Sequence, residues 1–487
     1  MTVSPGGDPA APAAPAVASN GAAAGRGTHG AAPDVAPTPP DGARSAATQP
    51  DGARSAAGAL DGGRAGTDPG AGEAEVPERV VVPLVEPSEG VPDPVTTADG
   101  LAAAIARLAA GTGPVAVDAE RASGYRYGQR AYLVQLRRKN SGTVLIDPVP
   151  LPDLSALDAA IADTEWVLHA ASQDLPCLSE LGLHPRTVFD TELAGRLLGF
   201  EKVGLGAMVE NQLGLALEKG HSAADWSTRP LPRSWLAYAA LDVEVLVELR
   251  DLLEVQLRET GKLEWAKEEF AAVAGAPPPA PRAEPWRRTS GIHRVRGRRA
   301  LATVRSLWEA RDALARQRDI APGRVLPDSA IVAAATANPG TDDDLAKLPV
   351  FAGRQQLRQL RRWFGAIADA RALPESELPL SAVPSDGPPP PNRWADRDPD
   401  AAARLAAARA ALAALSQQHS IPVENLLSPD LVRRLAWAPP DPLSADEVGA
   451  VLAAGGARSW QLGLAAPLLA EALTATAPPP ASVVTDQ

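Results

Sequence analysis

Proline-rich segments limit the size of any single domain that this chain can form. GAPPPAPRAEP occupies 275–285, and PESELPLSAVPSDGPPPP occupies 374–391. Proline fixes one backbone angle and lacks an amide hydrogen, so such segments act as semi-rigid spacers rather than as parts of a helix or sheet. The 487-residue chain is therefore expected to contain three ordered modules. Their expected ranges are 79–274, 286–373 and 392–474.

The two ends of the chain have a different composition from these modules. Residues 1–78 are mostly Ala, Gly, Pro and Asp, and they contain the octapeptide PDGARSAA twice. A segment with so few large apolar side chains cannot offset the entropy that is lost on ordering. We therefore predict that 1–78 and 475–487 are disordered tails, with linkers at 275–285 and 374–391.

Composition and charge narrow the class of protein. Cys177 is the only cysteine, which excludes intramolecular disulfides and fits a reducing compartment. The N-terminal stretch lacks the pattern of a signal peptide, and no apolar run is long enough to span a membrane. We expect a soluble cytoplasmic protein with no membrane partner.

The distribution of charge is uneven. The net charge of −12 argues against a general affinity for nucleic acid, because phosphates attract positive surfaces. The segment 282–318 nevertheless carries eleven arginines against three acidic residues. This block is either the solvated face of a helix or a local nucleic-acid surface.

The first module reads as an α/β domain with one central sheet. Its hydrophobic pattern predicts strands at 114–121, 130–138, 142–148 and 165–171, and helices at 96–113, 153–163 and 172–182, the last of them capped by Ser172. Beyond Asp190 the sequence pattern predicts only helices. The mixture of early strands with later helices indicates an α/β or α+β fold.

Four carboxylates lie in apolar surroundings in this module. Asp118 and Glu120 are two apart in a strand and share one face, although paired carboxylates resist desolvation. Asp174 lies at the junction between a predicted strand and a predicted helix, where open α/β sheets place ligands. Asp242 follows Tyr238 by four residues on one helical face. Because no Cys/His cluster accompanies these oxygens, they indicate Mg²⁺ or Mn²⁺, and a pair of such ions can catalyse phosphodiester hydrolysis.

The order of these residues resembles the tyrosine subclass of the DEDD 3′–5′ exonucleases. The stretches HAASQDL (169–175) and KGHSAADWSTRPLPRSWLAYAALDVEVLVEL (219–249) are similar to motifs of ribonuclease D. The resemblance implies a ribonuclease H-like exonuclease domain with a central mixed sheet.

The last two modules resemble each other. DALARQRDIAPGRVLPDSAIVAAA (312–335) aligns with AALSQQHSIPVENLLSPDLVRRLA (413–436), which indicates a duplicated helical unit. Both are similar to the helicase-and-ribonuclease-D C-terminal (HRDC) domain. We therefore expect two small all-α domains of this type.

The resemblance also assigns roles to single residues. It implies that Asp118, Glu120, Asp174 and Asp242 bind two divalent cations, and that Tyr238 orients and helps to deprotonate the attacking water. The residues expected to contact nucleic acid are Lys219, Trp226, Arg229, His169, Arg294, Arg296, Arg298 and Arg299. For Trp226 the alternative is core packing, for Arg229 an ion pair, and for His169 a hydrogen-bonded packing role.

The resemblance predicts a metal-dependent 3′–5′ exoribonuclease. It would release 5′-mononucleotides from RNA 3′ ends, as in the trimming of transfer RNA precursors, and would act as a monomer without a small-molecule cofactor. One alternative is a DNA exonuclease of the same fold, which differs in its response to the 2′-hydroxyl. Another is a catalytically silent RNA-binding scaffold, which the presence of all four acids disfavours.

Overall fold

The computed structural model describes residues 81–218, 220–278, 280–382 and 387–476. The expected tail at 1–78 lies outside these residues, as does the tail at 475–487 apart from its first two positions. The strands are β1 (Val82–Leu84), β2 (Thr112–Arg121), β3 (Ala131–Lys139), β4 (Gly142–Ile146), β5 (Glu165–Leu168), β6 (Thr187–Asp190) and β7 (Leu215–Leu217). The helices of this first module are α1 (Ala98–Ala110), α2 (Ser155–Ala160), α3 (Leu175–Ser179), α4 (Thr191–Leu198), α5 (Leu205–Leu213), α6 (Arg233–Glu244), α7 (Leu246–Glu259) and α8 (Leu263–Ala274).

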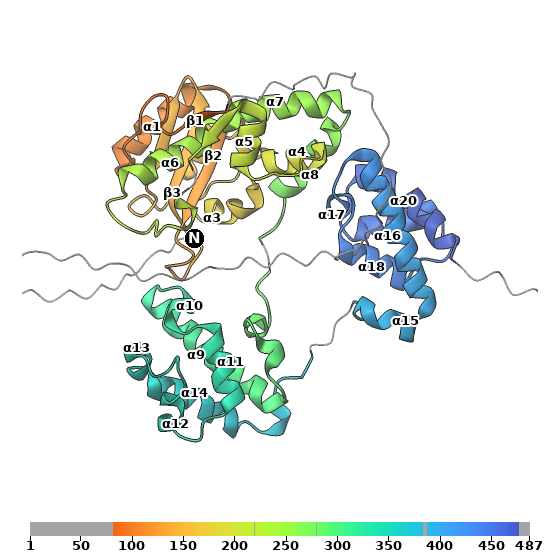
Figure 1. Ribbon diagram of the computed structural model, residues 1–487. Coiled ribbons are helices and arrows are strands. Elements are labelled where there is room, and N and C mark those ends of the chain that lie inside the picture. Colours follow the sequence, from red (N-terminus) through yellow and green to blue (C-terminus); the bar gives the residue numbers. More distant parts are fainter. Residues whose placement is uncertain (1–80, 219, 279, 383–386, 477–487) are drawn as a thin grey trace, which may run out of the picture. The chain divides into compact units, whose positions relative to one another are not determined.

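Five strands form one mixed sheet in the order β4-β3-β2-β5-β6 (Figure 1). β2 pairs antiparallel with β3 and parallel with β5, while β3–β4 is antiparallel and β5–β6 parallel. The sheet confirms the expected α/β class with a central mixed sheet.

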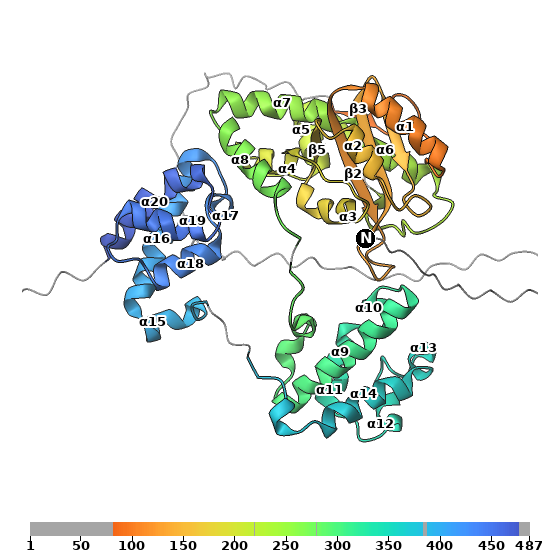
Figure 2. The same ribbon diagram turned by 180° about the vertical axis from the view of Figure 1, so that it is seen from behind.

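The two faces of the sheet are covered by different helices. On one face, Val117 of β2 belongs to a hydrophobic cluster with Leu108 of α1 and Leu178 of α3. On the other face, Ala116 packs with Val243 and with the start of α7. Figure 2 shows the sheet and its covering helices from behind. Because side chains alternate along a strand, this arrangement turns Asp118 and Glu120 towards α6 and α7.

Short elements were missed by the sequence patterns. β1 and β7 form a parallel pair of three residues each, and β7 lies beyond Asp190, where only helices were expected. A strand of three residues is too short to display an alternating pattern. The predicted cap was also wrong: Ser172 lies in a 3₁₀ turn, and α3 begins after Asp174.

The remaining helices form two modules that share the succession of a long helix, a four-residue helix and a longer helix. The first contains α9 (Arg298–Arg318), α10 (Pro322–Val325), α11 (Asp328–Ala337), α12 (Asp342–Ala346), α13 (Arg354–Leu357) and α14 (Leu360–Ala372). The second contains α15 (Trp394–Arg397), α16 (Pro399–His419), α17 (Val423–Leu426), α18 (Pro429–Trp437), α19 (Ala445–Ala454) and α20 (Ser459–Thr474).

The repeat is visible in how the long helices end. α9 and α16 both have 21 residues, and each ends at a residue in the left-handed region, Asp319 with φ 49° and Ser420 with φ 51°. A four-residue helix and a longer helix follow in both modules. The predicted duplication of a helical unit is therefore confirmed, while the expected boundaries of the modules stay predictions.

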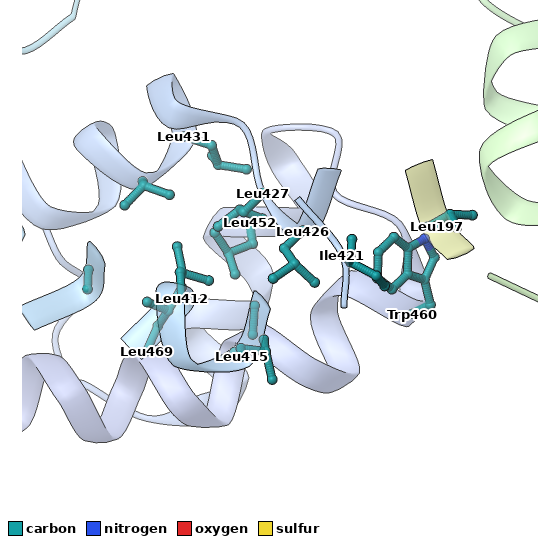
Figure 3. Close-up of a cluster of buried hydrophobic side chains, with 14 of the residues drawn as sticks. Leu197, Leu412, Leu415, Ile421, Leu426, Leu427, Leu431, Leu452, Trp460 and Leu469 are labelled. Carbon is teal, nitrogen blue, oxygen red and sulfur yellow. The ribbon is translucent and has the colours of Figure 1, made fainter. Parts of the chain in front are cut away.

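The second helical module shares a hydrophobic cluster with the first module of the chain. Figure 3 shows part of this cluster, with Leu197 of α4 and Trp460 of α20 among its members. The Lys262 ammonium, at the start of α8, donates to the carbonyls of Leu197 (2.7 Å) and His419 (2.6 Å). Both carbonyls lie at helix C-termini, where backbone oxygens lack helical partners. One buried lysine therefore joins two modules.

Candidate active site

Three of the predicted metal ligands converge in the structure. Asp118 and Glu120 extend from β2 towards α6, where Asp242 lies one turn after Tyr238. One carboxylate oxygen from each of these three acids lies within 4.8 Å of the others. The strand and the helix, which are far apart in sequence, thus build one acidic cluster.

Asp174 and Tyr238 lie at the same place. Together with the three clustered acids they line a cavity of about 620 Å³. The Asp174 carboxylate pairs with the Arg121 guanidinium at 3.3 Å, and Arg121 also donates to the Gln173 carbonyl at 2.6 Å. All four predicted carboxylates and the predicted tyrosine are therefore brought to one cavity.

Burial makes the negative charge of this cluster unfavourable. It raises the pKa values of Asp118, Glu120 and Asp242, and the charges of neighbouring acids raise those of Glu120 and Asp242 further. The pKa of Asp174 rises to about 8, through burial first and then the charge of Asp118. Arg121 lowers the pKa of Asp174 but does not offset the burial. A divalent cation would supply the compensation that is missing.

The donor set fits a hard divalent cation. All the clustered ligand atoms are carboxylate oxygens, which Mg²⁺ and Mn²⁺ prefer. Binding of a cation would release the protons that these acids hold in the metal-free protein. The sequence-based choice of ligands is consistent with this arrangement.

Tyr238 is half-buried beside the cluster. It lies one helical turn before Asp242, and both side chains line the cavity. Burial raises the pKa of Tyr238, and so do the negative charges of Asp242, Glu120 and Asp118. The phenol therefore keeps its proton at neutral pH, which suits a group that positions a water molecule better than a group that removes a proton from it.

Asp190 holds the turn that leads to Asp174. Its two carboxylate oxygens accept hydrogen bonds from the amides of Ala170 (3.1 Å) and Ala171 (2.8 Å), and the same side chain caps α4. Ala170 has a left-handed backbone with φ 58°, so the turn needs such an anchor. This aspartate was not recognised from the sequence. Its signal is an acidic residue at the junction of TVF and TEL, in the position of a helix cap.

Trp226 and Arg229 are both engaged within the fold. Trp226 has no exposed surface, and its ring nitrogen donates to the His221 carbonyl. The Arg229 guanidinium binds both carboxylate oxygens of Asp147, at 2.6 and 2.8 Å. A stacking ring must offer a free face, and a phosphate-binding arginine must offer free donors, so these contacts favour the structural alternatives over contact with a nucleotide. Lys219 lies outside the described residues.

His169 lies in the cavity wall, and Thr191 fixes its orientation. Its Nδ1 is 2.9 Å from the Thr191 hydroxyl. Burial lowers the pKa of His169 to about 4. At neutral pH the ring is uncharged, and any contact with nucleic acid is a neutral hydrogen bond.

The four predicted arginines of the helical module line a second cavity of about 600 Å³ at the start of α9. Two of them are also bonded within the module: Arg298 donates to the carbonyls of Leu378 (2.6 Å) and Pro379 (3.2 Å), and Arg299 binds the Glu375 carboxylate at 2.8 Å. These bonds fasten the segment after α14, and contact of the four arginines with RNA stays a prediction.

Comparisons with known proteins identify the domains. Residues 92–258 match the domain family described as 3′–5′ exonuclease, residues 300–374 match the HRDC domain, and residues 387–473 match the 3′ to 5′ exonuclease C-terminal domain. The ribonuclease D of Gluconacetobacter diazotrophicus is 31% identical over 72% of this chain and 88% of that protein. The chain belongs to the ribonuclease D family. It is a nuclease, and the exonuclease fold of this family implies the use of divalent metal ions.

Other similar proteins agree with this assignment. The ribonuclease D of Acidiphilium cryptum is 34% identical over 61% of this chain and 76% of its own length. A crystal structure of a protein from Bifidobacterium adolescentis has a TM-score of 0.74 and 39% identity, and covers 81% of this chain and all of that one. Escherichia coli RNase D, described as an exoribonuclease involved in structured RNA processing, has a TM-score of 0.58 and 26% identity over 79% of this chain and 98% of that one.

The two helical modules differ in these comparisons. Only the first matches the HRDC domain, while the second matches a family with another description. The expectation of two HRDC domains is therefore confirmed for one module, although the second repeats its order of helices.

Proposed function

We propose that this protein hydrolyses RNA from its 3′ end and releases 5′-mononucleotides. The observation that carries the proposal is the cavity in which four desolvated carboxylates meet a protonated tyrosine. Family membership supports RNA as the substrate, because the curated relatives are named ribonuclease D. The proposed cofactor is a pair of Mg²⁺ or Mn²⁺ ions held by Asp118, Glu120, Asp174 and Asp242.

Such ions, when bound, activate a water molecule and stabilise the leaving oxygen of a phosphodiester. The residues of the chain itself position the reacting groups. Tyr238 lies in the cavity wall one helical turn before Asp242, so its hydroxyl can orient the water that attacks the terminal phosphodiester. Arg121, beside Asp174, adds a positive charge to the wall of the cavity.

We further propose that the substrates are structured RNAs such as transfer RNA precursors. The E. coli relative, an exoribonuclease involved in structured RNA processing, supports this choice. Four arginines that line one cavity at the start of α9 support it as well: Arg294, Arg296, Arg298 and Arg299. No helix in the described part of the chain is long and apolar enough to cross a membrane. A cytoplasmic location and a monomeric state stay predictions.

The direct experiment compares matched RNA and DNA oligonucleotides as substrates for the full chain. Each carries a 5′ label, and each is incubated with Mg²⁺ and then with a chelator. We expect stepwise shortening of RNA from the 3′ end, metal dependence and nucleoside 5′-monophosphates as products. Faster cleavage of DNA would favour the DNA exonuclease instead.

The matched control is Asp242→Asn. Removing one member of a repelling cluster should leave the metal-free fold as stable as before or more stable. Metal affinity and turnover should collapse, because one ligand is lost. Near-normal activity of this variant in Mg²⁺ would contradict the proposed metal site.

A further inference from the structure

Gln135, at the centre of β3, is buried without a partner. Its side chain has no exposed surface, and neither its amide nitrogen nor its amide oxygen has a hydrogen-bond partner among the described residues. A buried amide that forms no hydrogen bond costs free energy, so native structures rarely keep one without a purpose.

The other buried glutamines of the described chain behave in the ordinary way. Gln356 donates to the Val325 carbonyl at 2.8 Å and accepts from the Trp363 ring nitrogen at 2.9 Å. Gln461 donates to the Asn425 carbonyl at 2.9 Å and accepts from the Arg458 amide at 2.8 Å. Gln135 therefore stands apart from residues of the same type and similar burial.

The position of Gln135 points to Asp118. The two residues are direct partners in the β2–β3 ladder, so their side chains leave the same face of the sheet with Cβ atoms about 5 Å apart. On the other side Gln135 is paired with Leu145 of β4, which packs with Leu133 in an apolar cluster under α6. Asp118 is thus the polar group that the register places next to this amide.

Gln135 lies behind the site and not in it. Asp118 lines the cavity, whereas Gln135 is not among the described residues that line it. Contact with the substrate is therefore excluded for a side chain with no exposed surface. The amide can act only through its neighbours.

The chemistry of the pair is complementary. A carboxylate that gives one oxygen to a cation presents the other to a hydrogen-bond donor, and such donors fix the orientation of ligands. The Gln135 amide has two N–H donors. Around Asp118, the groups that lower its pKa are the backbone amide of Ala119 and the charge of Arg121, so a side-chain donor is what this ligand lacks.

We propose that Gln135 is a positioning residue of the metal site, whose amide donates to the Asp118 carboxylate in the metal-bound protein. The inference rests on the metal site of the proposed function. The Gln135 amide, which is unpaired in the metal-free protein, then gains its partner when Asp118 binds the metal. The competing explanation is that Gln135 only fills the core.

The test is Gln135→Met, which keeps the length of the side chain and removes both polar atoms. Mn²⁺ affinity of the full chain, measured by titration calorimetry without substrate, should fall about 10-fold or more. The thermal midpoint in chelator should stay the same or rise, because no hydrogen bond of the metal-free protein is lost. The Mg²⁺ concentration for half-maximal cleavage should rise by a similar factor, with much of the turnover restored at saturating metal.

Gln356→Met is the matched control, because that glutamine is similarly buried but fully bonded. It should lower the thermal midpoint and leave Mn²⁺ affinity unchanged. If Gln135→Met fails to fold, Gln135→Leu is measured in the same way. A folded Gln135 variant whose Mn²⁺ affinity stays within about twofold of the natural chain overturns the inference, because loss of a supporting donor costs about 10-fold or more.

Failure of the proposed function gives a different result. If the natural chain binds no Mn²⁺, or binds it as well after Asp242→Asn, the metal site itself is wrong. If the natural chain binds Mn²⁺ and the Asp242 variant does not, an unchanged Gln135 variant rejects only the role of Gln135.

Discussion

Tyr238 shows how one residue can be tested apart from the cluster around it. Tyr238→Phe removes a hydroxyl and leaves the ring, α6 and every predicted metal ligand in place. If the hydroxyl positions the attacking water, single-turnover cleavage of RNA should slow by roughly 10²-fold or more. Mn²⁺ affinity and RNA affinity should change little, because neither depends on that oxygen.

A packing role for Tyr238 predicts the opposite pattern. A lost hydrogen bond would then cost about 1 kcal/mol of stability and leave the chemical step untouched. Full cleavage activity in the variant, together with a lower thermal midpoint, would therefore reject the positioning role.

His169 gives the protein a defined response to acid. Its pKa is about 4 in the folded chain because of burial, against about 6.5 in an unfolded one. Between these two pKa values the unfolded state binds a proton that the folded state does not bind. This residue therefore lowers stability as pH falls from about 6.5 towards 4. The buried acids act in the other direction, because their raised pKa values make the metal-free fold less stable as pH rises.

Comparison of variants isolates the contribution of the histidine. His169→Gln keeps a hydrogen-bonding group near Thr191 but does not titrate. Urea unfolding at pH 7 and pH 5, in chelator, should show that acidification changes stability more favourably in the variant than in the natural chain. Equal changes in the two proteins would show that His169 is not held neutral.

Patterns in the sequence indicated the charged residues of the site but not their neutral support. Asp118, Glu120, Asp174 and Asp242 were recognisable because a carboxylate in an apolar run is costly and needs a reason. Gln135 sits in the run YLVQL, where an uncharged side chain looks like an ordinary part of a strand. Its role depends on the register between two strands, which no single segment contains.

At the scale of elements, the loop before α6 is fastened to the sheet by one ion pair. Arg229 binds Asp147, which follows β4 and is almost fully buried. Arg229→Met should destabilise the fold by about 2–4 kcal/mol in urea unfolding, because it leaves the aspartate buried without its partner. Asp147→Asn in the same chain should recover part of that loss.

RNA affinity decides between the two roles of Arg229. If its role is structural, binding of single-stranded RNA by the folded variant should be close to that of the natural chain. A loss of affinity with no loss of stability would restore the sequence-based assignment of a nucleotide contact.

The longer strands of the sheet were predicted from the sequence. β2, β3 and β4 have five to ten residues, enough for alternation to be visible. β1 and β7 have three each and exist because they pair with each other, across a long stretch of intervening sequence. Local pattern cannot report a partner that lies so far away.

For the whole molecule, net charge and local charge have opposite signs. The chain is acidic overall, yet four arginines line one cavity at the start of α9. Changing Arg294 and Arg296 to glutamine should weaken binding of long RNA and reduce the salt dependence of that binding. The log–log slope should fall by about one unit for each phosphate that the variant no longer neutralises. Cleavage of short single strands should persist.

A matched control keeps this test specific. Arg186→Gln removes a well-exposed arginine of the exonuclease domain, which pairs with Asp163 at the surface. It should leave the salt slope as it was. If the double variant also keeps the natural slope, Arg294 and Arg296 do not meet phosphate groups.

The lysine between the two modules has a further consequence for chemical labelling. Lys262 is almost fully buried, burial lowers its pKa, and its ammonium group donates to carbonyls of two different modules. Amine-acylating reagents attack free, deprotonated amines, so this one is shielded only while α4 and α16 stay together. A lysine at the open surface reacts whether the modules are joined or apart, but this one would gain reactivity when they part. The rate at which Lys262 is acylated, measured by peptide mass spectrometry, would therefore report how often the interface opens.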